Sequence, residues 1–393
     1  MNQTTNVKPL LCLALPAWAG NYTKSTVELM KAMSEHRTVL YVDYTYTWKD
    51  VMMALLGKKP GLPILSVLGL KSRIRRISPQ LQVWSLPPLL PINGLPPGFA
   101  FRVVHCINSF LVQSSLTKAI RVWNGDDFVT INACQALYDR ALQKLPASKN
   151  IYYCYDEIAA AQWTDRHAAR FEKEAIGAAD ALVCSGSQLL AQKRQNGQPA
   201  LQIPNGVDPL FLQTQRDISP QSRPIIGYVG SLDERIDLDL LETVIQALPE
   251  YDFSFTGRLQ QPHIQQRLAA FGNVQFHPPV AYQALPQRMK HFSAGIIPFL
   301  RNDLTAGIYP MKVNEYLALG LPVVSTGFGD MHQLQPWATV ADQAESFIQA
   351  LRMELSLDHL DKQNERRSFA AQQTWQARAL QLNKLIEKLE NPA

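Results

Sequence analysis

The sequence predicts an α/β protein made of two doubly wound domains, each built on a mainly parallel sheet. Two observations carry this prediction. Apolar runs of strand length alternate with amphipathic runs of helix length in both halves of the chain. The 393 residues also exceed what one hydrophobic core usually fills. An apolar fraction of 46% with 18% charged residues is typical of a folded globular protein.

The first half of the chain opens with a strand, a helix and a second strand, as a parallel sheet requires. The three runs are LLCLALPAW, STVELMKAMSE and RTVLYVDYT. The same order then returns as DDFVTINA, NIYYCYDE, RHAARFEKEAIGAA and DALVCSGS. We expect loops over the proline-rich residues 86–98, and we expect QIPNGVD to close the first sheet.

Residues 209–224 are polar and without periodicity, which favours a linker. A second alternating series follows it. Its runs are PIIGYVGS, LDLLETVIQAL, DFSFTG, PHIQQRLAAF, NVQFHPP, YQALPQRMKHF, AGIIPF and LPVVST. The predicted domains are therefore residues 1–206 and 207–372, followed by an amphipathic helix within 373–393.

Composition excludes several classes of protein. A net charge of +5 with no dense basic run argues against nucleic-acid binding, although it suits anionic ligands or lipids. Five cysteines without a C-x-x-C pair indicate buried thiols and a reducing compartment. No apolar run reaches the roughly 18 residues that a membrane-spanning helix needs, so we expect a cytoplasmic protein that does not cross a membrane.

The segment GIYPMKVNEYLALGLPVVST combines helix signals with two charged residues. Pro310 suits the first turn of a helix and Gly320 suits the position just past its end, which predicts a helix over 311–319. Val313, Tyr316 and Leu317 would form its buried stripe. Lys312 and Glu315 lie one turn apart on an adjoining face.

Two interpretations of Lys312 and Glu315 are open from the residues alone. The first is a surface ion pair worth a few tenths of a kcal/mol. The second is an anion site, because a helix N-terminus that follows the turn Thr305-Ala306-Gly307 offers amides to a phosphate. Lys312 would add a cation there, and Glu315 would accept hydrogen bonds from the hydroxyls of a ribose. A nucleoside diphosphate supplies both groups.

The same segment resembles the donor-site signature of GT-B glycosyltransferases, in particular glycosyltransferase family four and the bacterial exopolysaccharide enzymes close to it, such as teichuronic-acid and glucuronosyl transferases. The pattern is P-x-K-x-x-E-Y-L-A-x-G-x-P-V-V. The matching residues are Pro310, Lys312, Glu315, Tyr316, Leu317, Ala318, Gly320, Pro322, Val323 and Val324. The resemblance implies two Rossmann-like domains with parallel sheets facing across a cleft, the first for the acceptor and the second for the donor.

Other runs resemble parts of those enzymes in the same order. IPNGVD is similar to the junction before the second domain, IIGYVGSLDERIDLDLL to its first strand and glycine loop, and NVQFHPPVAYQALPQRM to the strand and loop that bind the nucleobase. TWQARALQL is similar to the last helix, which in the family crosses back to the first domain. By this resemblance we assign residues 373–393 to that helix.

The resemblance and the glycine loops together give a set of predicted donor-binding residues. They are Gly20, Gly230, Arg235, Arg258, Val280, Thr305, Ala306, Tyr309, Lys312 and Glu315. At Gly20 and its neighbour Asn21 the backbone would approach the donor or acceptor. We expect no metal and no cofactor besides the nucleotide-sugar co-substrate, for which a UDP sugar is the first choice. Retaining relatives often carry a glutamate where this chain has Gly307, so inversion and retention both stay open.

Two adjacent acids follow the predicted strand NIYYCYDE. Asp156, with Glu157 beside it, is the candidate catalytic base that would take the proton of the acceptor hydroxyl. An N-cap aspartate followed by a first-turn glutamate is the competing interpretation.

Residues 58–77 mix apolar side chains with Lys71, Arg73, Arg75 and Arg76. This mixture suits a segment lying on an anionic membrane surface, and a solvated loop and helix is the alternative. The predicted function is sugar transfer to a glycan or lipid-linked acceptor in bacterial cell-surface polysaccharide synthesis, in the cytoplasm or peripheral on the inner face of the plasma membrane.

Three other classes of protein share parts of this pattern. An NAD-dependent oxidoreductase would need the G-x-G-x-x-G fingerprint, and Gly227 and Gly230 give only G-x-x-G. A nucleotide-sugar 2-epimerase of the same fold would form an epimer from the donor alone. A non-catalytic sugar-nucleotide-binding protein would bind the donor without turnover.

Overall fold

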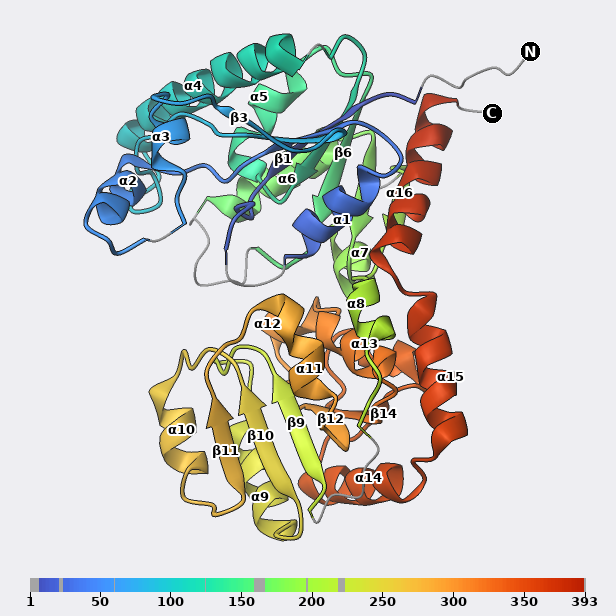
Figure 1. Ribbon diagram of the computed structural model, residues 1–393. Helices are drawn as coiled ribbons and strands as arrows, with labels where there is room; N and C mark the ends of the chain where they lie inside the picture. The colour runs from blue at the N-terminus through green and yellow to red at the C-terminus, as the bar shows by residue number, and fades with distance from the viewer. Residues whose placement is uncertain are drawn as a thin grey trace. The chain divides into compact units, whose positions relative to one another are not determined.

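The protein is described by a computed structural model that covers residues 7–20, 24–59, 61–123, 125–158, 167–195, 197–217 and 223–391. Asn21 and part of the expected linker over 209–224 lie outside the described residues. The chain divides into two compact units (Figure 1). Unit 1 comprises Met1–Ser185, Leu189–Ile203 and Ala379–Ala393, and unit 2 comprises Gly186–Gln188 and Pro204–Arg378.

Unit 1, in its described residues, is built on an eight-stranded sheet with the order β3-β4-β2-β1-β5-β6-β7-β8. Every pair is parallel except β3 with β4, which is antiparallel. The strands are β1 (Leu10–Ala14), β2 (Val39–Val42), β3 (Ile74–Ser78), β4 (Leu81–Trp84), β5 (Val129–Ala133), β6 (Lys149–Cys154), β7 (Ala181–Cys184) and β8 (Ala200–Gln202). The helices that lie wholly or mostly in unit 1 are α1 (Ser25–Met33), α2 (Trp48–Leu55), α3 (Ile64–Val67), α4 (Phe99–Trp123), η1 (Ala136–Tyr138), α5 (Asp139–Gln143), α6 (Ala168–Ala178), α7 (Ser187–Lys193) and α16 (Trp375–Glu390).

The central strands of unit 1 are buried on both faces, which explains their continuous apolar sequences. Every residue of β1, β2 and β5 is buried. Two features of unit 1 are additions to the expected pattern. Residues 74–84 form the β3–β4 hairpin at the edge of the sheet, and the loop region is followed by the 25-residue helix α4.

Unit 2, over the part of the chain that is described, has a six-stranded parallel sheet with the order β11-β10-β9-β12-β13-β14. Its strands are β9 (Ile225–Val229), β10 (Asp252–Thr256), β11 (Val274–His277), β12 (Ala294–Ile297), β13 (Val323–Ser325) and β14 (Thr339–Val340). Its helices are α8 (Pro209–Gln213), α9 (Leu238–Ala247), α10 (Pro262–Leu268), η2 (Tyr282–Ala284), α11 (Leu285–Met289), α12 (Asp303–Ala306), α13 (Met311–Ala318), η3 (Met331–Leu334), α14 (Ala344–Ser356) and α15 (Leu360–Ala371).

The strand order of unit 2 reverses between β9 and β12. From β9 the chain moves outward through β10 and β11, then returns to pair β12 on the other side of β9. In open α/β sheets such a reversal opens a crevice at the carboxyl ends of the two strands, where ligands bind. The loops after β9 and β12 are therefore the first place to look for a site.

The linker expectation was wrong for its first residues, because Pro209–Gln213 form α8. Asp208 caps this helix, since its side chain accepts a hydrogen bond from the N–H of Leu210, and Phe211 buries itself in the core of unit 2. The predicted helix over 311–319 is confirmed as α13 at Met311–Ala318. Pro310 is its N-cap residue, one position earlier than expected.

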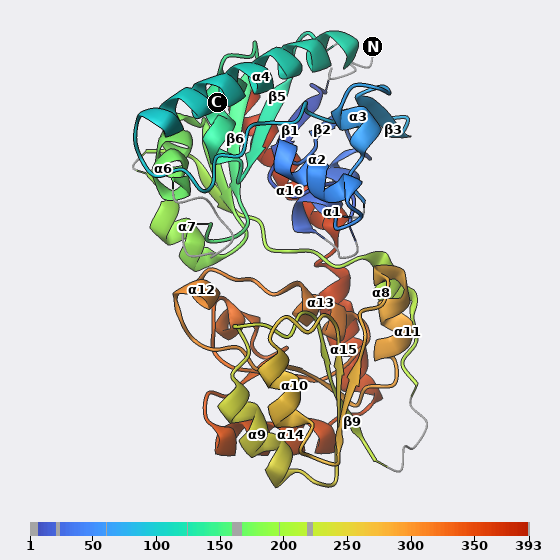
Figure 2. The same cartoon turned by 90° about the vertical axis from the view of Figure 1, so that its left-hand side faces the viewer.

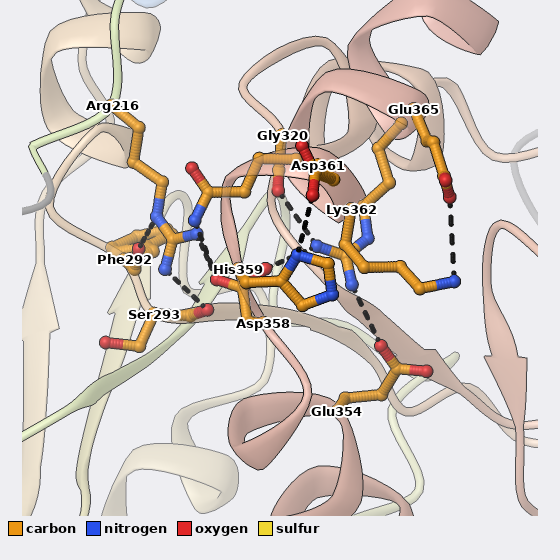
Figure 3. Close-up of polar contacts among 12 residues, drawn as sticks. Arg216, Phe292, Ser293, Gly320, Glu354, Asp358, His359, Asp361, Lys362 and Glu365 are labelled. Carbon is orange, nitrogen blue, oxygen red and sulfur yellow. Dashed lines mark hydrogen bonds and ion pairs between the residues drawn. The ribbon is translucent and has the colours of Figure 1, made fainter.

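Helix α13 is held at its C-terminal end by α15 (Figure 3). Arg366 donates to the carbonyl of Gly320 at 3.1 Å and is paired with Asp358 at 2.6 Å and with Glu354 at 3.1 Å. Asp358 is paired on its other oxygen with Arg216 at 2.6 Å. Cations at the end of a helix satisfy its last carbonyls and complement its dipole, so this network fixes where α13 ends.

The last helix, α16, belongs to unit 1 from Ala379 onward. Asn383 accepts a 2.7 Å hydrogen bond from the buried Arg37, which follows α1. Helix α16 is the red helix beside α1 in Figure 1. Among the described residues no helix combines the length and apolar character needed to span a bilayer.

Candidate donor site

The loops after β9 and β12 meet the start of α13 at the strand-order reversal of unit 2. Gly230 directly follows β9, Phe299 lies two residues after β12, and Lys312 is the second residue of α13. Tyr228, from β9 itself, contacts Lys312. The sheet topology thus gathers residues from three distant parts of the sequence at the position where a ligand is expected.

The ammonium group of Lys312 lies on a floor of aromatic side chains. Its Nζ donates a 3.0 Å hydrogen bond to the hydroxyl of Tyr228. It lies 4.1 Å from the ring centroid of Tyr228 and 4.7 Å from that of Phe299. Both contacts are in the range of cation–π attraction. Within the described residues Lys312 and Glu315 form no ion pair, so the surface-pair interpretation does not describe this structure.

The pKa of Lys312 is lowered from its usual value of 10.5 to about 7. Burial of the ammonium is the largest cause, and the positive charge of Arg235 acts in the same direction. Asp233 and Glu315 oppose the shift. The charged form of Lys312 has lost part of its hydration. An anion placed beside the ammonium stabilises this form, because the anion replaces the lost interactions with water.

Two glycines keep the space next to Lys312 open. Gly230 has φ +139°, and a Cβ on it would lie 2.9 Å from the Nζ of Lys312. Gly257, after β10, has φ +153°, and a Cβ there would lie 1.9 Å from the carbonyl oxygen of Gly230. Side chains at either position would collide with the loop or with the lysine, so the close approach of the two loops requires glycine.

Arg235 is the second cation of the site. Its Nε and Nη2 donate to the two oxygens of the buried Asp233 at 2.8 and 2.6 Å. The guanidinium lies 5.1 Å from the ring centroid of Phe299, the ring that also faces Lys312. This paired geometry fixes the fork of the guanidinium close to the lysine.

Glu315 lies one turn along α13 and is only 6% exposed. Burial raises the pKa of its carboxyl from 4.5 to about 7, against the opposing effects of Lys312 and of a hydrogen bond with Tyr282. A buried carboxyl in this position accepts hydrogen bonds well once it ionises, which suits a pair of hydroxyl donors.

The turn before α13 is more self-contained than expected. Asn302 caps α12: its side-chain oxygen accepts the N–H of Thr305 at 3.1 Å, and its backbone carbonyl accepts the N–H of Ala306 at 2.9 Å. The buried hydroxyl of Thr305 donates to the carbonyl of Leu300. The expectation that these two amides are free is therefore wrong, because the side chain of Asn302 caps Thr305 and the helical turn of α12 satisfies Ala306 through the backbone. Their contact with a donor stays a prediction.

The remaining predicted donor residues are spread more widely. Tyr309 is buried, its carbonyl accepts from Asn205 at 2.7 Å and its hydroxyl lies 3.4 Å from Asn314. Arg258 is exposed in the loop after Gly257, and Val280 is half-buried in the loop after β11. Gly20 lies in unit 1, after β1, with φ +152°. The structure thus brings together Gly230, Arg235, Lys312 and Glu315.

The two candidate acids of unit 1 follow β6 and differ in their surroundings. The carboxylate of Glu157 accepts from Lys193 at 2.7 Å, and the same ammonium pairs with the buried Glu172 at 2.6 Å. Asp156 accepts the N–H of Glu157 at 3.0 Å. Glu157 is thus part of a structural ion cluster, which leaves Asp156 as the better candidate for a base.

Sequence reasoning missed four residues that shape the site. Tyr228 and Phe299 look like ordinary core residues of two strands. Asp233 carries a weak signal, since it stands two residues before Arg235 in a loop. Gly257 carries a stronger one, as a glycine directly after the strand DFSFT, the same position that Gly230 holds after β9.

The two parallel-sheet units and their strand order define the GT-B class of fold. Similarity to solved structures supports this over nearly the whole chain. Sucrose-phosphate synthase from Thermosynechococcus elongatus matches with a TM-score of 0.70 at 14% identity, covering 98% of this chain and 100% of that one. A glycosyltransferase from Rickettsia africae matches with a TM-score of 0.68 at 13% identity, covering 99% and 100%. The UDP-forming trehalose-phosphate synthase from Burkholderia xenovorans matches with a TM-score of 0.68 at 12% identity, covering 98% and 100%.

Within that fold, residues 223–356 match the family described as Glycosyl transferases group 1. Unit 2 thus contains a glycosyltransferase domain of that group, and the predicted GT-B fold is confirmed. The chain is also 24% identical over 221 residues to TuaH of Bacillus subtilis (strain 168), which carries the name of a teichuronic acid biosynthesis glycosyltransferase. That match covers 52% of this chain and 56% of TuaH, so the chain aligns with about half the length of this curated relative.

Proposed function

We propose that the protein is a glycosyltransferase that takes a sugar from a nucleoside diphosphate sugar, with a UDP sugar as the first choice. The observation that carries the proposal is the half-buried pair of cations, Lys312 and Arg235, that face the ring of Phe299 at the strand-order reversal of a group 1 domain. The growing negative charge on a leaving diphosphate is stabilised by preorganised cations in an enclosed site.

The residues have distinct roles in this proposal. Lys312 and Arg235 bind the diphosphate, Glu315 accepts hydrogen bonds from the ribose hydroxyls, and Gly230 leaves room for the phosphates. Asp156, from unit 1, takes the proton of the acceptor hydroxyl as it attacks the sugar carbon, while the bond from that carbon to the diphosphate oxygen breaks.

The acceptor is proposed to be a glycan or lipid-linked saccharide of the bacterial cell surface. The similarity to TuaH supports this choice, as does the resemblance of the donor segment to exopolysaccharide enzymes. The reaction would then take place in the cytoplasm, with peripheral contact to the inner face of the plasma membrane.

Binding of UDP tests the donor site directly. We expect UDP to raise the melting temperature of the protein, because a ligand that prefers the native state stabilises it. Lys312→Ala should lower UDP affinity at least tenfold through loss of a charge-assisted contact. The matched control is Lys362→Ala on α15, whose side chain is 51% exposed. Unchanged UDP affinity in Lys312→Ala would remove the proposed site.

Turnover separates transfer from the other activities of this fold. Incubation with a panel of UDP sugars and saccharide acceptors should release UDP only when an acceptor is present. Formation of a sugar epimer from the donor alone would instead identify an epimerase, and UDP-sugar binding with no product under any acceptor would identify a binding protein.

A further inference from the structure

The basic charge of the chain is concentrated in one stretch of unit 1. Residues 44–123 contain ten lysines and arginines and a single acid, Asp50, which gives this stretch a net charge of +9, while the whole chain carries +5. The rest of the protein is therefore net negative. Asp50 itself is already paired with Lys59 at 2.5 Å.

Most of these cations point into solvent. Lys59 is paired with Asp50, and Arg73 donates to the carbonyls of Val67 and Ser85. The other eight are exposed and form no ion pair with a described residue: Lys49, Lys58, Lys71, Arg75, Arg76, Arg102, Lys118 and Arg121. A concentration of uncompensated charge of this size attracts an anionic partner.

The same stretch exposes an unusual amount of apolar surface. Of eighteen large apolar side chains that are exposed among the described residues, twelve fall within it. They are Trp48, Met52, Leu55, Leu56, Leu65, Leu70, Ile77, Phe99, Val103, Ile107, Phe110 and Val122. Single exposed apolar residues are ordinary, whereas a concentration like this marks an interaction surface.

Helix α4 shows most clearly that this exposure is not incidental. Its inner face buries Phe101, Val112, Leu116 and Ala119 against unit 1. On the opposite face, at helical spacing, lie Phe99, Val103, Cys106 and Phe110, which we call the outer stripe of α4. Phe99 is 76% exposed and Phe110 68% exposed. The helix thus carries a second apolar stripe that unit 1 leaves uncovered.

Helices α2, α3 and the first turns of α4 lie on the same side of unit 1. They are at the left of unit 1 in Figure 1 and face the viewer in Figure 2. Val51 of α2 and Val67 of α3 pack in one small core, which leaves Leu55 and Leu56 at the end of α2 about 65% exposed. Charged side chains on an edge strand prevent it from pairing with other chains, and this alone could explain Arg75 and Arg76 on β3. It does not explain the exposed apolar side chains on α2 and α4.

We propose that this side of unit 1, formed by α2, α3, β3 and the outer stripe of α4, docks on an anionic lipid bilayer. Apolar side chains enter the boundary between headgroups and acyl chains while the surrounding cations contact anionic headgroups, the combination that holds a protein on a membrane surface. A protein partner of neutral charge would be matched by the apolar residues alone. The exposed cations on and beside this surface, Lys49, Lys58, Lys71, Arg75, Arg76 and Arg102, favour an anionic lipid surface. This surface would be the site of the membrane contact named in the proposed function. The biological meaning of the docking therefore rests on that proposed function.

Cosedimentation with vesicles tests the docking surface without any nucleotide sugar. We expect binding to vesicles of phosphatidylcholine with phosphatidylglycerol and little binding to phosphatidylcholine alone. Binding should fall at least tenfold between 0.1 M and 1 M salt, because the Debye length shortens to about 3 Å. Equal binding to both kinds of vesicle, or to neither, would overturn the proposal.

Paired variants separate the contributions of charge and apolar contact. Lys58→Glu with Lys71→Glu should lower binding to anionic vesicles at least tenfold, since each basic residue near such a surface contributes about fivefold. Lys384→Glu with Lys388→Glu on α16 makes the same change in net charge at exposed positions outside the surface, and should have a much smaller effect. Equal effects of the two pairs would show that only net charge matters and would overturn the proposed location.

The contribution of the apolar contacts is tested with the double variant Phe99→Ser and Phe110→Ser. The control is the double variant Leu357→Gln and Leu360→Gln, at exposed positions of unit 2. Only the first pair should weaken vesicle binding. If that pair instead turns a dimer into a monomer in solution and leaves vesicle binding intact, the stripe is a protein interface and the proposal fails. UDP binding by all these variants should match that of the unaltered protein, so loss of membrane docking is distinguishable from failure of the donor site.

Discussion

Lys312 and Arg235 share one aromatic ring. The Nζ of Lys312 lies 4.7 Å and the guanidinium carbon of Arg235 5.1 Å from the ring centroid of Phe299. Two cations this close repel each other, which is one reason that the pKa of Lys312 is lowered. An anion of two negative charges placed against both would remove that repulsion, and the first prediction follows from this relationship.

UDP binding should take up a proton at and above pH 7. The pKa of free Lys312 is about 7, and a bound diphosphate raises it, so affinity should fall as pH rises above 7. Lys312→Arg, charged at every pH used, should abolish the dependence. Because Glu315 titrates in the same range, both proteins are compared in a Glu315→Gln background by calorimetry in buffers of different ionisation enthalpy. Identical pH profiles would contradict the assignment.

Glu315 should make stability depend on pH between 4.5 and 7. Its folded pKa of about 7 lies above the ordinary 4.5, so in this window the native state holds a proton that the unfolded chain has released. The resulting stabilisation is complete below pH 4.5 and is lost as pH rises to 7. Glu315→Gln lacks this loss and should gain stability relative to the unaltered protein from pH 5 to pH 8, as measured by urea unfolding. A difference that does not change with pH would contradict the prediction.

Gly230→Ala should weaken UDP binding more than it weakens the fold. The added Cβ would lie 2.9 Å from the Nζ of Lys312 at a backbone φ of +139°, so it displaces the ammonium and strains the loop by about 1–3 kcal/mol. The control is Gly272→Ala, where no atom lies within 4 Å of the new Cβ. Equal UDP affinity in the two variants would show that UDP does not occupy the space between Gly230 and Lys312.

Asp156→Asn should lower transfer about 100-fold or more while leaving UDP affinity unchanged, because a positioned general base is worth about that much. Asp126→Asn, at an exposed position of unit 1, serves as the control for loss of an acid. Rates of UDP release with acceptor present, compared with UDP affinities, separate the two effects. Full turnover by folded Asp156→Asn would assign the base elsewhere.

Arg366→Met should destabilise unit 2 by about 3 kcal/mol, since it leaves a buried carboxylate of Asp358 short of one partner and frees the carbonyl of Gly320. Lys362→Met on the same helix removes only an exposed pair with Glu365, and should change stability by less than about 1 kcal/mol. The two variants are compared by denaturant unfolding. Similar losses of stability in both variants would contradict the stabilising role given to the contacts of Arg366 with Asp358 and Gly320 (Figure 3).

The sequence was informative where local patterns decide the structure. The strands β1 and β9 and the helix α13 follow from apolar runs, a proline and a glycine, each read within a few residues. Helix α4 was missed because it is apolar on two faces and so lacks the single stripe that marks an amphipathic helix. The β3–β4 hairpin was missed because arginines interrupt the alternation in β3.

The candidate site shows the same division. Lys312 and Glu315 stand out by their spacing, and Gly230 by its place after a strand. The ring of Phe299 and the hydroxyl of Tyr228 reach Lys312 only because the sheet reverses its strand order, which no local pattern encodes. The capping of Thr305 by Asn302 is a local contact that the sequence does suggest, since asparagine is a favoured cap.

The return of α16 to the first unit has a consequence for synthesis on the ribosome. Asn383, the partner of Arg37, is translated only after all of Pro204–Arg378. At 5–20 residues per second this means a wait on the order of ten seconds or longer. During that interval the nascent amino-terminal half lacks the partner of Arg37, so unit 1 reaches its final stability only after α16 has emerged from the exit tunnel.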